Sequence, residues 1–128
     1  MATMSTAVAT DRPARSAAAR ASTRRFLEGL LLTPASEVAD AVVLVVSELV
    51  TNALRHGGGT CTLHLTAHPD SIEVAVRDPS PHLPRERTPG LNGGTGGFGW
   101  PMASRLAHTT TVTRQPTRGK TVSAFLAR

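Results

Sequence analysis

The sequence has 128 residues, 40% hydrophobic and 18% charged, which predicts one globular domain large enough to bury a core. The net charge of +5 would attract an acidic protein partner or nucleotide phosphates, whereas the aromatic content of 3% argues against a nucleic-acid surface built on base stacking. A single cysteine, Cys61, excludes an internal disulfide and a cysteine-based zinc site. No signal peptide and no run of 18 apolar residues is present, so we expect a cytoplasmic protein without membrane contact.

The N-terminal segment is expected to contain a helix after a short tail. Residues 1–10 show no periodicity, which predicts a flexible tail, or a short edge strand at most, before a single domain at 11–128. Asp11 can cap a helix that carries Pro13 in its first turn and runs to about residue 31. Five arginines lie off its apolar stripe: Arg12, Arg15, Arg20, Arg24 and Arg25. They form either a solvated face or a docking face for an acidic partner.

A second helix is predicted from Pro34 to His56, because the apolar pattern is unbroken and stops at Gly57. Its apolar residues cover most of the circumference, which indicates burial on more than one side. Glu48, Asn52 and His56 recur every four residues and therefore share one face. Polar groups on a buried helix are costly unless they are paired, so we take this stripe as a candidate site. The alternatives are a solvated stripe and, for His56, a cap at the helix end.

Alternation of apolar and polar residues predicts four strands, at residues 61–67, 72–77, 109–114 and 121–126. The first two pair as an antiparallel hairpin, which ends at Asp78-Pro79-Ser80 because proline stops the ladder. A short helix is expected at 101–107. The order of these elements predicts an α+β fold, a two-layer sandwich in which helices cover one face of a mostly antiparallel mixed sheet.

The segment 82–99 is rich in glycine and leads directly into the short predicted helix. Glycines such as Gly97 and Gly99 let backbone N–H groups converge on an anion, and a helix N-terminus adds partial positive charge. This pattern predicts a phosphate site. The alternative is a surface loop that is only flexible.

Three side chains could complete a nucleotide site. Asn52 offers a neutral oxygen to Mg²⁺, which takes the rest of its coordination shell from water and phosphate. Glu48, one turn earlier, can polarise a hydroxyl or water beside the phosphate. Asp78, at a strand end, can accept a hydrogen bond from the 6-amino group of a purine. The alternative for Asp78 is an Asx turn or a helix cap.

Together these residues resemble the GHKL ATPase superfamily, which includes histidine-kinase catalytic domains, gyrase B-type topoisomerases and MutL. The matching motifs are an N box at Glu48–His56, two glycine boxes at Val76–Ser80 and Gly96–Met102, and a closing Gly-x-Thr strand at Gly119–Val122. Within the superfamily, Ser-Glu-Leu-Val-Thr-Asn-Ala and Arg-Asp-Pro-Ser-Pro look like stand-alone anti-sigma-factor serine kinases and the short actinobacterial regulators related to them.

The resemblance implies a left-handed βαβ-type sandwich that binds ATP and Mg²⁺ between helices and sheet. It implies Mg²⁺ at Asn52, phosphoryl transfer served by Glu48, and adenine at Asp78 with support from Thr121. A lid at residues 84–97 would cover the phosphates. The further nucleotide-binding residues expected from the motifs are Arg55, His56, Ser80, Gly97, Gly99 and Trp100.

The activity implied by the resemblance is that of a serine/threonine protein kinase in a partner-switching pathway. Its partners would be a sigma factor, an anti-anti-sigma (antagonist) protein or both, and relatives of this kind are often homodimers. One alternative is a non-catalytic ATP-binding module that sequesters a sigma factor or other regulator. Another is a scaffold that has lost nucleotide binding, because Ser80 replaces the usual glycine of the first box and Trp100 the usual leucine of the second.

Overall fold

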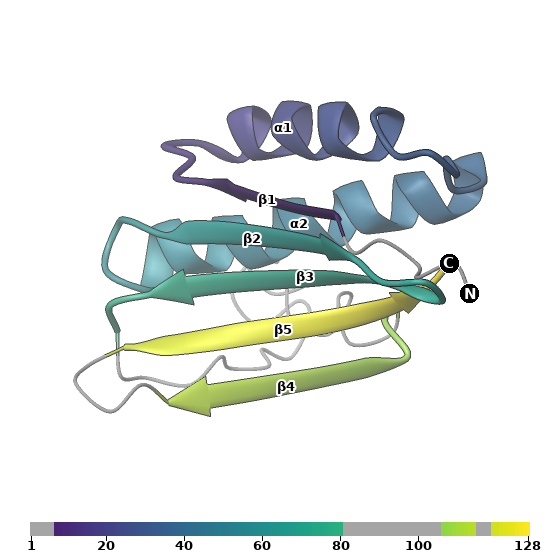
Figure 1. The fold of residues 1–128 in the computed structure, drawn as a ribbon. Helices are drawn as coiled ribbons and strands as arrows, with labels where there is room; N and C mark the ends of the chain where they lie inside the picture. The colour runs from purple at the N-terminus through teal and green to yellow at the C-terminus, as the bar shows by residue number, and fades with distance from the viewer. Residues whose placement is uncertain (1–6, 81–105, 115–118) are drawn as a thin grey trace, which may run out of the picture.

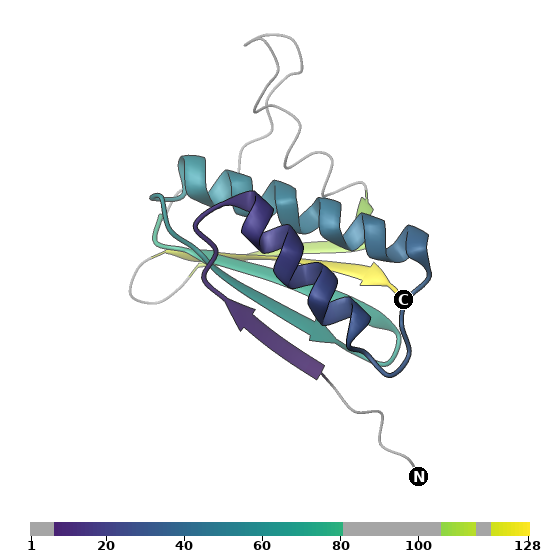
Figure 2. The ribbon, with the colours of Figure 1, turned by 90° about the horizontal axis from the view of Figure 1, so that it is seen from above.

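The chain forms a two-layer α+β sandwich in a computed structural model that describes residues 7–80, 106–114 and 119–128. Its elements are β1 (Ala7–Asp11), α1 (Ser16–Glu28), α2 (Ser36–His56), β2 (Thr62–Ala67), β3 (Ser71–Asp78), β4 (Thr109–Arg114) and β5 (Lys120–Ala127). The sheet order is β1-β2-β3-β5-β4, and the four described pairings are all antiparallel. Both helices cover the same face of the sheet (Figures 1 and 2). The predicted fold class is confirmed.

The long helix α2 forms the centre of the core, as its apolar pattern predicts. Its buried residues are Val42, Val43, Val45, Val46, Leu49, Val50 and Ala53. They pack on the central strands β3 and β5, whose inward positions alternate with outward ones. The helix ends at His56, with Gly57 as its C-cap, again as predicted.

The N-terminal segment differs from the prediction. Residues 7–11 form β1, so the edge-strand alternative is correct for them, and α1 begins only at Ser16. Asp11 does not cap the helix, because it pairs with Leu63 in the sheet and its carboxylate accepts a hydrogen bond from Ser22 Oγ at 2.5 Å. Strand β1 depends on pairing with β2, which lies more than 50 residues later in the chain. The local periodicity of residues 7–11 does not indicate that pairing.

Several predicted features lie outside the described residues. They are the lid at 84–97 with Gly97 and Gly99, Trp100, and most of the helix expected at 101–107. Among the described helices, none combines the length and the hydropathy that crossing a membrane requires.

Candidate functional site

The polar stripe of α2 lies on a side of the helix that α1 leaves uncovered. Ser47 accepts a hydrogen bond from Arg20 at 3.0 Å, and Thr51 shares one with Ser16 at 2.6 Å, so these residues face α1. Glu48 directly follows Ser47, and Asn52 directly follows Thr51. Consecutive residues of a helix are rotated by about 100° about its axis, so Glu48 and Asn52 are turned by that angle from Ser47 and Thr51. Both are half-buried, and within the described part of the chain neither side chain makes a hydrogen bond or ion pair. No described residue therefore occupies their polar atoms.

The last turn of α2 carries Arg55 and His56, and both are exposed. A cation near a helix C-terminus is favoured by the helix dipole. Because both side chains are exposed, they cost little free energy at this place even without a ligand. A cap at the helix end, the alternative given above for His56, is therefore sufficient to explain that residue.

Asp78, the last residue of β3, forms a buried ion pair with Lys120, the first residue of β5. Lys120 Nζ lies 3.0 Å from both Oδ1 and Oδ2, and the two side chains are 3% and 6% exposed for Asp78 and Lys120, respectively. The register makes them direct neighbours on the helix-facing side of the sheet. Two opposite charges this deeply buried stabilise each other, whereas either one alone would be costly.

Two glycines allow the backbone to approach Asp78 closely. A β-carbon on Gly57, just after α2, would lie 2.6 Å from Asp78 Cγ and Oδ2. A β-carbon on Gly119 would lie 2.3 Å from the Asp78 carbonyl oxygen, and its φ of +92° is itself unfavourable for other residues. The end of α2, the end of β3 and the start of β5 therefore meet at the Asp78 side chain.

The turn after β3 is an Asx turn. The backbone N–H of Ser80 donates to Asp78 Oδ1 at 2.9 Å, so the Asx turn given above as the alternative for Asp78 is present. This hydrogen bond does not exclude a ligand, because a carboxylate has more than one acceptor position on each oxygen. Ser80 itself is buried beside the site.

The role expected of Thr121 does not agree with the register. Thr121 pairs with Arg77, and paired residues share one face of the sheet, which alternation along β3 makes the face opposite the buried Asp78 side chain. The register therefore does not place the Thr121 side chain directly beside the Asp78 carboxylate. Lys120, one residue earlier, occupies the position beside the Asp78 carboxylate.

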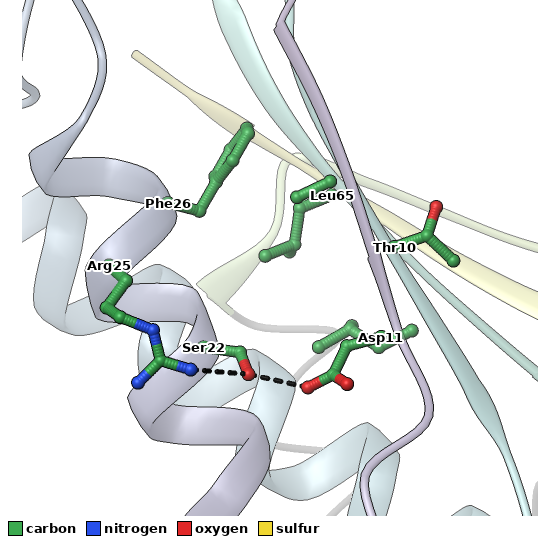
Figure 3. A pocket seen from close by; sticks show the side chains of 8 residues that line it. Thr10, Asp11, Ser22, Arg25, Phe26 and Leu65 are labelled. Atoms are coloured by element: carbon green, nitrogen blue, oxygen red, sulfur yellow. Dashed lines mark hydrogen bonds between the residues drawn. The ribbon is translucent and has the colours of Figure 1, made fainter.

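Two pockets open near the N-terminal strand. One, of about 610 Å³, is bordered by Asp78 and by the loops that precede α1 and β2. The other, of about 390 Å³, lies between β1 and α1, where Phe26 and Leu65 face the space and Ser22 links Arg25 to Asp11 (Figure 3). Glu48 and Asn52 line neither of these two pockets.

Cys61 immediately precedes β2, and its thiol is buried. Burial, together with the negative charges of Asp78 and Asp11, raises the pKa of the Cys61 thiol to about 11. The thiol is therefore neutral and unreactive near neutral pH, as expected for a small buried hydrophobic side chain.

The donors present suit a magnesium ion that is shared with phosphate. Within the described residues, no three His, Cys, Asp or Glu side chains cluster to hold a metal. The amide of Asn52, which has no partner in residues 7–80, 106–114 and 119–128, offers a single neutral oxygen ligand. Mg²⁺ accepts such a site, because it commonly keeps several waters and binds phosphate oxygens in place of protein groups.

Lys120 and Gly57 are the two site residues that sequence reasoning missed. The signal for Lys120 was present, because it alternates with the buried Val122, Ala124 and Leu126. A lysine in an inward position of a strand requires an acidic partner, and Asp78 holds the matching inward position of β3.

Comparison with known proteins identifies the family of the chain. A search of curated proteins found no significant match. The family model for the histidine kinase-like ATPase domain matches residues 9–125, nearly the entire chain. The chain therefore belongs to the histidine kinase-like ATPase domain family.

Proposed function

We propose that the protein binds ATP with Mg²⁺ between α2 and the strands β3 and β5, and transfers phosphate to a serine or threonine of a regulatory protein partner. The observation that carries the proposal is the stripe of Glu48 and Asn52, which are half-buried and unpaired within the described residues. Membership of an ATPase-domain family supports the nucleotide. The motif resemblance to anti-sigma-factor kinases supports the class of partner.

The positions along α2 suit a nucleotide that extends from base to phosphates. Asp78 lies against Gly57, the residue that follows α2. Asn52 and Glu48 lie five and nine residues before Gly57. At 1.5 Å per residue these separations are about 7.5 and 13.5 Å along the helix axis. A base at Asp78 would therefore direct its phosphates toward Asn52 and then Glu48.

Each of these side chains would have a distinct task. Asn52 Oδ1 would hold Mg²⁺, which, when bound, neutralises charge on the phosphates. The Glu48 carboxylate would accept the proton of the attacking hydroxyl, which lowers the barrier to phosphoryl transfer. Asp78 would accept a hydrogen bond from the exocyclic amine of the base.

Two measurements test the proposal in sequence. Calorimetric titration of the full chain with ATP and Mg²⁺ should show saturable binding, and incubation with radiolabelled ATP and a cognate antagonist protein should label a serine or threonine. Glu48→Ala should retain binding and lose the label. The absence of any heat of binding at millimolar ATP would exclude nucleotide binding and favour a scaffold. ATP binding without phosphate transfer to any encoded partner would exclude kinase activity.

A second candidate function is an ATP-binding module that sequesters a sigma factor or another regulator without chemistry. It is favoured by the arginines of α1 and the loop before it. All five are exposed: Arg12, Arg15, Arg20, Arg24 and Arg25. Such a face suits an acidic partner. Three results together would support this module over the kinase. Wild type and Glu48→Ala should bind the purified partner with equal affinity, and charge reversal of Arg20 and Arg24 should abolish that binding. No phosphate should be transferred to the partner.

A further inference from the structure

The sandwich is open between α1 and the edge strand β1. Ala7 and Ala9 of β1 pair with the buried Ala67 and Leu65 of β2 and share their helix-facing side of the sheet. Alanine is too short to fill the volume beneath the helix, and a pocket of about 390 Å³ lies between β1 and α1. The half-buried ring of Phe26 borders it from the side of α1 (Figure 3). The pocket therefore has apolar walls and room for a further apolar side chain.

Strand β1 also presents an open backbone edge. It is the first strand in the sheet order, and among residues 7–80, 106–114 and 119–128 it pairs only with β2. No strand of the described chain takes up the N–H and C=O groups that point away from β2. A strand added at this edge would turn every second side chain toward the pocket, because successive side chains of a strand point to opposite faces.

Arg25 places a positive charge at the pocket. Its guanidinium donates to Ser22 Oγ at 3.4 Å, a long hydrogen bond to a neutral group, and it forms no ion pair with the residues that the structure describes. The carboxylate of Asp11, on the same pocket, has donors of its own in Ser22 Oγ and the backbone N–H of Arg12. Most of the five N–H donors of Arg25 are therefore left for a carboxylate from another molecule.

We propose that the β1 edge and the pocket beside it dock an extended segment of the protein partner, which pairs with β1, inserts an apolar side chain beneath α1 and sets a carboxylate against Arg25. Each part of this surface selects one property of the occupant. The open edge selects an extended chain, the walls formed by Phe26 and Leu65 select an apolar side chain, and the guanidinium selects an acid. The inference rests on the proposed function only for the existence of a protein partner, because Glu48 and Asn52 do not line this pocket.

The probe is a capped five-residue peptide, Thr-Leu-Thr-Glu-Thr, which matches β1 in length. In a strand its leucine and glutamate point to the same face. The capped peptide Thr-Leu-Glu-Thr-Thr is the matched control, because it has the same composition but places these two side chains on opposite faces. Titration of the probe into the isotope-labelled full chain should shift the amide resonances of β1 and α1, with a dissociation constant of about 1 mM. The control should bind about tenfold more weakly, and methylation of the backbone nitrogens of the probe should abolish binding.

Two variants of the chain test the pocket and the charge separately. Ala9→Ile fills the pocket from β1 and should weaken binding of the probe by about tenfold or more. Val8→Ile, on the same strand but on the opposite face, is the control and should leave binding unchanged. Arg25→Glu should weaken binding of the probe and restore binding of a peptide with lysine in place of its glutamate. Because Arg25 is exposed, this exchange of charges decides the question even if Ala9→Ile does not fold.

Three results would overturn the inference. Equal binding of the two peptides of the same composition would show that the edge and the pocket do not act together. Unchanged binding of the probe to both Ala9→Ile and Arg25→Glu would place it elsewhere on the chain. Dimerisation of the wild-type chain that Ala9→Ile abolishes, without binding of the probe, would assign this face to a second copy of the chain.

Titration of the same samples with ATP and Mg²⁺ keeps this inference apart from the proposed function. Binding of the probe without binding of ATP would support the docking site and exclude the nucleotide. Binding of ATP without binding of the probe would overturn the docking site and leave the nucleotide site standing.

Discussion

The carboxylate of Asp78 occupies the space that a β-carbon on Gly57 would need, with Cγ and Oδ2 each 2.6 Å from that point. The residue after α2 is thereby held against the end of β3. Any side chain at position 57 must displace either the helix end or the Asp78–Lys120 pair.

Gly57→Ala should therefore destabilise the fold by about 1 to 3 kcal/mol, the usual cost of overpacking. The backbone φ of −104° at Gly57 is accessible to alanine, so the effect is steric. Gly29→Ala is the matched control, because Gly29 also follows a helix, has a φ of −82° and has no atom closer than 3.4 Å to the added carbon. Urea denaturation of both variants measures the difference, and equal stabilities would contradict the prediction.

Replacing Asp78 by Asn should cost about 3 to 5 kcal/mol, because Lys120 would keep a buried charge without its counter-ion. Adding Lys120→Met to Asp78→Asn should recover part of that loss, since the uncompensated charge is removed. Guanidinium denaturation of wild type, both single variants and the double variant gives the coupling free energy. A double variant that simply sums the single effects would show that the pair is not coupled.

Glu48→Gln should bind ATP with an affinity within a few-fold of wild type and slow phosphate transfer by about 10² to 10⁴, the usual contribution of a general base. The substitution preserves size and removes the proton acceptor. Glu37→Gln, at the exposed start of the same helix, is the control and should leave transfer unchanged. Single-turnover transfer from radiolabelled ATP is the measurement, and an unaffected rate in Glu48→Gln would exclude this role for Glu48.

Asn52→Ala should weaken ATP binding by about tenfold when Mg²⁺ is present and have little effect when the metal is chelated. The amide would act only through the ion, so its removal should matter only when the ion is there. Ser47→Ala, on the side of α2 that faces α1, controls for general changes in the helix. Calorimetry with and without EDTA distinguishes the two conditions. Equal losses in both would assign Asn52 to direct nucleotide contact.

Stability should fall between about pH 9 and pH 11 partly because of Cys61. Its pKa is raised from 9.0 to about 11 in the fold, so the protonated thiol favours the folded state below pH 9 and that contribution is lost as the pH passes 11. The expected loss is about 1 to 2 kcal/mol. Urea midpoints at pH 8 and pH 10.5 for wild type and Cys61→Ala test it, and identical pH dependence in the two would refute it.

Regular periodicity predicted much of the fold and part of the site. The apolar pattern of α2 ends at Gly57 in the structure as in the sequence, and the strand alternation placed β2, β3, β4 and β5 within one or two residues. These signals are local. Strand β1 was anticipated only as the alternative to a flexible tail, and the start of α1 was not recovered, because pairing with β2 is a tertiary contact that overrides the capping preference of Asp11.

The difference between the motif and the register at Thr121 had another cause. The motif Gly-x-Thr directed attention to the threonine, although period-two alternation already placed Lys120 inward and Thr121 outward. Distances between side chains from different strands, such as Asp78 to Lys120, depend on sheet order and register. Neither follows from one strand's own sequence.

The sheet order joins Asp78 to Lys120 across 42 positions of the chain, because β3 and β5 are neighbours although β4 comes between them in sequence. The entropy of closing such a connection grows only with the logarithm of its length, and a doubling costs about 0.6 kcal/mol. Insertions or deletions between these two strands should therefore leave the ion pair formed. The chain can change the length of that intervening segment while the two residues that meet at the sheet end stay fixed.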